Sequence, residues 1–206
     1  MNELVYTLHS DGSSDRRLMP ILDWLLRANS VECAIHGQWA DLRFVRLPPR
    51  EPAERIRKAA SLYPCELLFV HRDAEREPYA ARHAEIMATL RRTTFDGNPP
   101  AAVCVIPVRM QEAWLLFDEP AIRHAAGNPA GVMPLKLPAL KQCERLPDPK
   151  STLYGLLREA SGKSGRRREK LDVHYLAHRV PEWIEDFGPL RALPAFAQLE
   201  DAWDRR

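Results

Sequence analysis

Residues 4–18, LVYTLHSDGSSDRRL, decide the fold of this chain and its candidate chemistry. The first five are apolar or β-branched, which is typical of a β-strand. Asp11 and Gly12 then favour a tight turn, and a basic segment with leucines at helical spacing follows. The stretch therefore predicts a strand, a turn and a helix in succession, with carboxylates at the end of the strand.

Further apolar runs extend this pattern over the first half of the chain. The runs at 66–70 and 101–108 are short and continuous, as expected of strands covered on both faces in a parallel sheet. Residues 31–47 predict another strand region, as a hairpin around Gly37. Helical patterns separate these runs, so we predict an α/β fold: a Rossmann-like, mostly parallel sheet flanked by helices.

Prolines shape the helices. Pro20 predicts that the first helix starts after Ser14 or bends, because an interior proline removes a hydrogen bond. After Met110 the chain shows helical patterns bounded by prolines and no strand pattern. We therefore predict an α/β domain over 1–118 and a helical extension over 119–206 packed on it, and a length of 206 residues suits this organisation.

Composition indicates where the chain works. No run of about 18 uncharged apolar residues and no signal-peptide pattern is visible, so we expect a cytoplasmic protein that does not associate with membranes. A homo-oligomer is left open.

Acidic residues follow each of three expected strands. Asp11 and Asp15 follow the first, Asp73 and Glu75 follow the run at 66–70, and Glu112 follows the run at 101–108. Ligands bind open parallel sheets beyond the carboxyl ends of the strands, where these acids would meet. A divalent cation would relieve their repulsion, and oxygen ligands suit Mg²⁺ or Mn²⁺.

Each acid also has a structural interpretation. Asp11 suits a turn, Asp15 suits a helix N-cap, and Glu112 suits the first turn of a helix. Asp73 and Glu75 could pair with neighbouring arginines on the surface. Taken singly the structural interpretation is favoured, whereas the joint placement of the acids favours a metal site.

The two acidic segments of the first half resemble the motifs of the TOPRIM (topoisomerase–primase) family. Asp11-Gly12-Ser13-Ser14-Asp15 resembles its Glu-Gly-x-x-Asp turn, and Asp73-Ala74-Glu75 resembles its Asp-x-Asp motif. The likeness covers residues 1–118. The remainder is similar to small stand-alone TOPRIM-like proteins related to ATPase-associated nucleases of the overcoming-lysogenization-defect type.

The resemblance implies a Mg²⁺-dependent nuclease. It implies that Asp11 acts as general acid/base and that Asp73 and Glu75 are catalytic metal ligands. Asp11, Asp15 and Glu112 would also support the metal or position water. The chain departs from the family pattern in having Asp at position 11, where Glu is usual, and Glu at position 75, where Asp is usual.

Basic residues offer contacts to phosphate. Residues 136–170 carry ten Lys and Arg against four Asp and Glu. Such an excess fits a phosphate-facing surface and equally fits a solvated helix. The candidates for contact with nucleic-acid phosphate are Lys150, Lys163, Arg166, Arg167, Arg168 and Arg72. His71, at a strand end, could orient water or contact phosphate, or be an ordinary strand-end histidine.

These features leave three functions open. The first is a metal-dependent nuclease on DNA or RNA, which the resemblance links to an ATPase and to phage defence. The second is a non-catalytic module of the same fold that binds an ATPase or nucleic acid, suggested by the departures at Asp11 and Glu75. The third is a receiver-like phosphotransfer domain with Asp73 as phosphoacceptor, although no partner lysine after a fifth strand is identifiable.

Overall fold

A computed structural model describes residues 3–205, and the chain divides into two compact units. The first unit holds the residues up to Ile106 together with those from Gln198 onward, and the second spans Pro107–Ala197. The sequence pattern places the boundary at residue 118. In the structure the chain leaves the first unit earlier and returns to it at the end.

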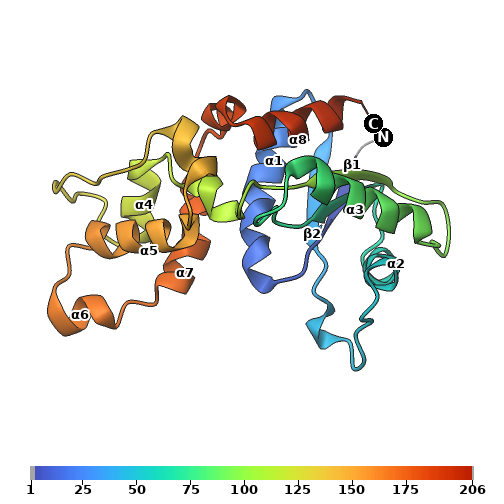
Figure 1. Ribbon diagram of the computed structural model, residues 1–206, viewed down its shortest axis with the longest axis horizontal. Helices are drawn as coiled ribbons and strands as arrows, with labels where there is room; N and C mark the ends of the chain where they lie inside the picture. The colour runs from blue at the N-terminus through green and yellow to red at the C-terminus, as the bar shows by residue number, and fades with distance from the viewer. Residues whose placement is uncertain (1–2, 206) are drawn as a thin grey trace. The chain divides into compact units, whose positions relative to one another are not determined.

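The first unit is built on a four-stranded sheet in which every strand is parallel to its neighbours. The strands are β1 (Glu3–His9), β2 (Ala34–Trp39), β3 (Leu67–His71) and β4 (Ala101–Val105), in the order β2-β1-β3-β4 (Figure 1). The predicted α/β, Rossmann-like sheet is confirmed.

The hairpin predicted around Gly37 is wrong. Residues 34–39 form one strand that pairs in parallel with β1, and the 3-10 helix η2 (Leu42–Phe44) follows it. Gly37 is needed inside the strand because a Cβ there would lie 2.5 Å from the ring of Tyr6. The glycine makes room for a core side chain and does not turn the chain.

Helices of the first unit cover both faces of the sheet. The helices are η1 (Ser13–Leu18), α1 (Met19–Ala28), α2 (Pro52–Leu62), α3 (Tyr79–Arg92) and the end of α8 (Pro194–Asp204). Pro20 lies in the first turn of α1, where its missing N–H leaves no bond unmade. Of the two predicted alternatives, a later start or a bend, the α-helix shows the later start, at Met19, after the 3-10 helix that begins at Ser13.

Alternation along β1 assigns α1 and α2 to opposite faces. The Tyr6 hydroxyl donates to Oδ1 of Asp23 in α1 over 2.7 Å, whereas the Thr7 hydroxyl donates to the Tyr63 carbonyl just after α2 over 2.8 Å. Successive side chains of a strand point to opposite faces, so His9 lies on the same face as Thr7. This face, covered by α2, is the one to which His9 points.

The second unit is helical, as predicted for this part of the chain. Residues 107–197 contain no strand, and the Trp114 and Phe196 rings meet edge to face in its core, with centroids 5.4 Å apart. Its elements, ahead of the start of α8, are η3 (Gln111–Leu115), α4 (Glu119–Ala125), η4 (Leu140–Arg145), α5 (Pro149–Ala160), α6 (Gly165–Glu169), α7 (Val173–Arg179), η5 (Val180–Glu182) and η6 (Gly188–Ala192).

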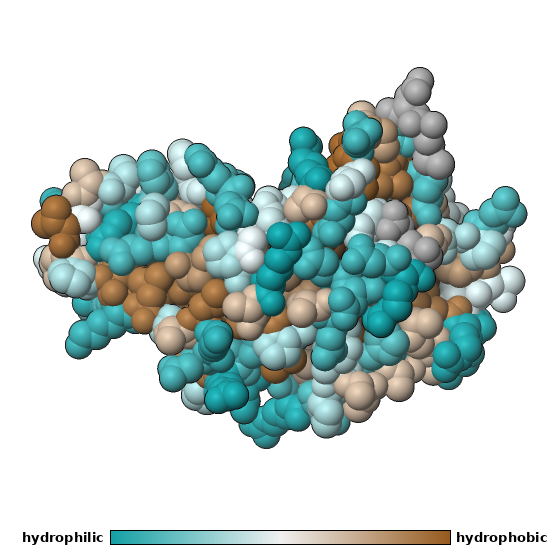
Figure 2. Space-filling view, turned by 90° about the horizontal axis from the view of Figure 1, so that it is seen from above, coloured by the Kyte–Doolittle hydropathy of each residue, from teal (hydrophilic) through white to brown (hydrophobic). Residues whose placement is uncertain are grey.

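Hydrophilic and apolar residues are interspersed on the face drawn in Figure 2. Across residues 3–205, no helix is both long enough and apolar enough to cross a lipid bilayer.

Candidate functional site

Two adjacent strands deliver the candidate site to one edge of the sheet. β1 ends in His9 and β3 ends in His71, and both side chains are buried. The loops that follow bring four of the predicted acids to a single cavity of about 190 Å³. Its lining residues are Asp11, Gly12, Asp15, His71, Arg72, Asp73 and Glu75.

Asp15 closes the turn that follows β1. Its Oδ2 accepts a hydrogen bond from the Gly12 amide over 2.9 Å, and its Oδ1 accepts one from the Ser14 hydroxyl over 3.1 Å. The N-cap interpretation of Asp15 is therefore wrong: the N-cap of η1 is Gly12, and Asp15 stands three residues further on, where its carboxylate accepts from the N-cap amide. Oδ1 also faces Nε2 of His71 at 3.8 Å, so the same carboxylate contributes to the cavity.

His71 is held in one orientation by the backbone. Its Nδ1 lies 3.0 Å from the Val105 carbonyl, and because a carbonyl only accepts, the ring donates from Nδ1. Nε2 is then the nitrogen that faces Oδ1 of Asp73, at 3.7 Å, and Asp15 on the other side. Nε2 therefore lies between two carboxylates, those of Asp15 and Asp73.

Asp73 and Glu75 lie in the loop that follows β3. Their side chains are 27% and 72% exposed. Glu75 has a φ of 54°, a left-handed conformation that is rare for a residue with a Cβ. Glu75 lies 3.9 Å from the Arg82 guanidinium, and Arg82 is itself hydrogen-bonded to Glu85. Backbone strain of this kind is often found at functional sites.

Asp73 and Glu75 are the residues of this cavity that could hold Mg²⁺ or Mn²⁺. Among residues 3–205 no three His, Cys, Asp or Glu side chains are grouped to hold a metal ion. Mg²⁺ in phosphate-processing sites is commonly held by one or two carboxylates, with waters and substrate phosphate completing its shell. Asp73 and Glu75 suit that mode, since the Asp15 oxygens already accept hydrogen bonds from Gly12 and Ser14.

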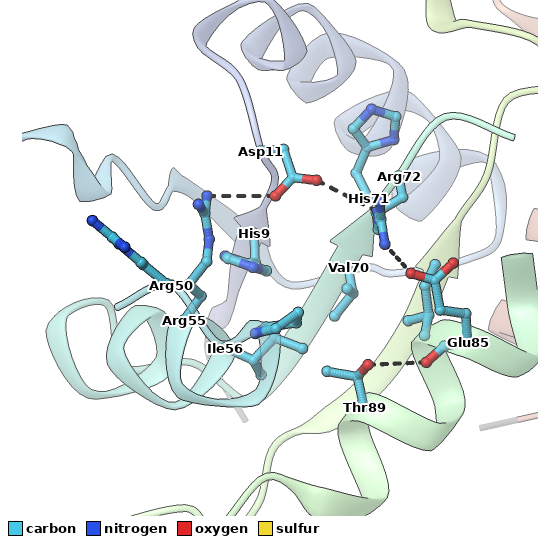
Figure 3. A pocket seen from close by; sticks show the side chains of 12 residues that line it. His9, Asp11, Arg50, Arg55, Ile56, Val70, His71, Arg72, Glu85 and Thr89 are labelled. Carbon is cyan, nitrogen blue, oxygen red and sulfur yellow. Dashed lines mark hydrogen bonds and ion pairs between the residues drawn. The ribbon is translucent and has the colours of Figure 1, made fainter. Parts of the chain in front are cut away.

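Asp11 forms ion pairs with two arginines. Its Oδ1 lies 3.4 Å from Nη2 of Arg55, and its Oδ2 lies 3.4 Å from Nε of Arg72 (Figure 3). The carboxylate is 61% exposed, so each pair contributes little to stability. Asp11 borders the cavity described above and two more cavities of the first unit.

One of those neighbouring cavities is rich in arginine. It measures about 180 Å³, and its polar lining residues are His9, Asp11, Arg50, Arg55, His71, Arg72, Glu85 and Thr89. His9 is only 5% exposed, and its burial, together with the nearby Arg55, lowers its pKa to about 4. The imidazole of His9 is therefore neutral near pH 7.

Sequence reasoning missed Arg50, Arg55 and Glu85. Arg50 precedes α2, whereas Arg55 lies in α2 and Glu85 in α3, where a basic or acidic residue matches the pattern of any solvated helix. The one local signal was the position of Arg50 just ahead of the Glu51-Pro52 helix start.

The remaining predicted residues lie in the second unit. Glu112 is buried in η3, with an exposed fraction of 3%. Lys150 is half-buried in the first turn of α5, with Nζ 6.0 Å from the centre of the Tyr154 ring. Lys163 and the three arginines of α6, Arg166, Arg167 and Arg168, are exposed. Their contacts with phosphate, and the metal role of Glu112, stay predictions.

Comparison with known proteins finds no relative of this chain. The chain matches no protein-family model, no curated protein sequence and no solved structure.

Proposed function

We propose that this protein is a Mg²⁺- or Mn²⁺-dependent phosphodiester hydrolase of TOPRIM type that acts on DNA or RNA. One observation supports the proposal above the others: Asp11, Asp15, His71, Asp73 and Glu75 line one cavity at the carboxyl edge of a parallel sheet, the position at which such sheets bind ligands. An arginine-rich cavity adjoins it.

Asp73 and Glu75 would hold the metal, which when bound neutralises charge on the phosphate and activates water for attack. His71 would exchange a proton at Nε2, because its Nδ1 is engaged by the Val105 carbonyl. Asp15, 3.8 Å from Nε2, stabilises the protonated ring. Asp11 keeps its predicted role as general acid/base, at the junction between the acids and the arginines.

Phosphate would be bound by arginines of the same unit. Arg55 and Arg72 both approach Asp11, and a guanidinium can donate two parallel hydrogen bonds to a phosphate. The exposed residues Lys163, Arg166, Arg167 and Arg168, and the half-buried Lys150, are proposed to contact the backbone of a longer substrate.

The direct test is cleavage of a panel of single- and double-stranded DNA and RNA, including tRNA, with Mg²⁺ or Mn²⁺. Wild type and Asp73→Asn are compared, with Asp96→Asn as the matched control, since Asp96 is an exposed acid paired with Arg57. Cutting that is abolished by EDTA and by Asp73→Asn, and retained in Asp96→Asn, supports the proposal. Equal cutting by Asp73→Asn and wild type rejects this site.

A non-catalytic binding module is the second candidate. The observation that favours it is the lack of a three-residue metal group among residues 3–205. Such a module would bind nucleic acid or an ATPase with the same affinity in wild type and Asp73→Asn, and would cleave nothing on the panel with saturating metal.

A receiver-like phosphotransfer domain is the third candidate. Asp73 follows β3 as a phosphoacceptor would, but no lysine lines its cavity. Incubation with acetyl phosphate and Mg²⁺ tests it, since a receiver would gain one phosphoryl group that Asp73→Asn cannot accept.

The cellular setting follows from the motif resemblance alone. We propose a cytoplasmic nuclease that works with an ATPase in phage defence, and addition of that ATPase to the cleavage panel should raise its rate. A homo-oligomer remains a further part of this proposal, to be measured by the mass in solution.

A further inference from the structure

The arginine-rich cavity of the first unit carries an excess of positive charge. Three arginines (Arg50, Arg55 and Arg72) face two carboxylates (Asp11 and Glu85). Within residues 3–205, Arg50 forms no ion pair, and Arg55 pairs only with Asp11, at 3.4 Å. The cavity therefore favours an anionic ligand.

Two polar atoms in its wall are buried without a hydrogen-bond partner. Nδ1 of His9 and Nε of Arg55 find no partner among the residues that the structure describes. His9 is more than nine-tenths buried, and both residues line the cavity. Buried polar atoms in native proteins are rarely left unpaired, so such a pair indicates a ligand that offers acceptor oxygens.

Apolar side chains form the rest of the wall. Ile56, Val70 and Ile86 are each almost completely buried. Charges beside such a wall interact more strongly than charges in water, because the surroundings are less polarisable. Figure 3 shows Arg55 and Arg72 reaching Asp11 from different elements, with His9 below them in that view.

We propose that this cavity binds a phosphate monoester, such as a nucleotide or the terminal phosphate of a nucleic-acid strand. Phosphate oxygens take the place of the Asp11 carboxylate at Arg55 and Arg72, and accept hydrogen bonds from Nε of Arg55 and from the His9 ring. The binding is independent of any reaction. Its use to hold the end of a strand being cut rests on the proposed function.

The test is calorimetric titration of the full chain in EDTA with adenosine 5′-monophosphate, adenosine 3′-monophosphate and adenosine. At least one monophosphate should bind ten times more tightly than adenosine, or better. Arg55→Gln and Arg72→Gln should each weaken that binding about tenfold, the loss expected for a charge-assisted hydrogen bond. Arg57→Gln is the matched control, since Arg57 lies on the same helix but pairs with Glu54 outside the cavity.

A second pair of variants tests for a gain in monophosphate affinity. Asp11→Asn removes the competing carboxylate and should tighten monophosphate binding several-fold. Glu54→Gln makes the same change of charge on α2, outside the cavity, and should leave the affinity within twofold. Equal affinity for adenosine and both monophosphates, or an equal loss in Arg57→Gln and Arg55→Gln, would overturn the proposal.

The two proposals fail separately. EDTA removes the divalent cation that cleavage requires, so phosphate binding without metal-dependent cutting keeps the cavity and rejects the hydrolase. If the protein instead cuts nucleic acid with metal but binds the monophosphates and adenosine equally, the hydrolase proposal stands and the phosphate-binding cavity is rejected.

Discussion

Nε2 of His71 lies 3.7 Å from Oδ1 of Asp73, while the opposite ring nitrogen is held by the backbone of β4. The residue at the end of one strand is thus oriented by its neighbouring strand and directed at an acid in the loop that follows. This arrangement leaves a single nitrogen able to exchange a proton toward the cavity.

The first prediction concerns that nitrogen. His71→Gln should lower metal-dependent hydrolysis by about 10²-fold or more, the usual contribution of a general acid or base. The affinity for Mg²⁺, measured by calorimetry, should stay within about threefold of wild type, because Asp73 and Glu75 are unchanged. The pH–rate profile should also lose one limb. A variant that keeps the full profile would exclude a proton-transfer role for His71.

The strained backbone of Glu75 predicts that a substitution there changes stability and activity in different directions. Glycine adopts a φ of 54° without the penalty that a Cβ imposes, so Glu75→Gly should leave stability unchanged or raise it by about 1 kcal/mol. Mg²⁺ affinity and cleavage should fall, since a proposed ligand is lost. Urea unfolding and metal titration of the same sample measure both. Glu77→Gly, a change at a nearby exposed acid, should affect neither metal binding nor cleavage.

Buried His9 predicts that acid destabilises the fold. The folded-state pKa is about 4, below the usual value of 6.5, so between these values the unfolded chain binds more protons than the folded one. The His9 contribution to the free energy of unfolding should therefore fall as the pH drops from about 7 to about 4, by an amount on the order of 3 kcal/mol, and this contribution should level off below pH 4. Above pH 7 the group contributes no pH dependence.

Comparison of wild type with His9→Gln isolates that contribution from the carboxylates, which titrate in both proteins. Urea unfolding at a series of pH values should give a flatter curve for the variant between pH 4 and 7. Parallel curves would mean that folding does not lower the pKa of His9.

Two glycines predict opposite effects of the same substitution. Gly37→Ala places a Cβ 2.5 Å from the Tyr6 ring and should destabilise the protein by about 1–3 kcal/mol. Gly155→Ala lies in α5 with no atom within 4 Å of the new Cβ, and should stabilise it by up to about 1 kcal/mol. Denaturant midpoints compare the two directly, and a tolerated alanine at position 37 would contradict the observed packing of β2 on Tyr6.

Local pattern predicted the sheet well because buried parallel strands are continuous apolar runs, as at 66–70. It failed at Gly37, since the reason for that glycine is the ring of Tyr6, which lies 31 residues away in sequence. A glycine that locally favours a turn therefore lies inside a strand, because a contact with a distant residue requires it there. The start of α1 was predictable because Pro20 acts through its own backbone.

The residues of the candidate site also fall into those that the local sequence predicts and those that depend on tertiary packing. Acids that follow strands could be predicted to meet, because parallel register brings strand ends together. Arg55 could not, since its place depends on how α2 lies over the face of β1 to which Thr7 and His9 point. The ion pairs of Asp11 with two arginines could not be predicted from the sequence either, although Arg72 stands next to Asp73.

The return of the chain to its first unit bears on the order in which the protein can fold during synthesis. Asn29, just after α1, donates to Glu200 of α8 over 3.0 Å, so a segment near the end of the chain joins one near the start. Domains generally fold as units while the chain emerges from the ribosome. The first unit, although its strands are all made before residue 107, reaches its full set of contacts only after the whole second unit has been synthesised.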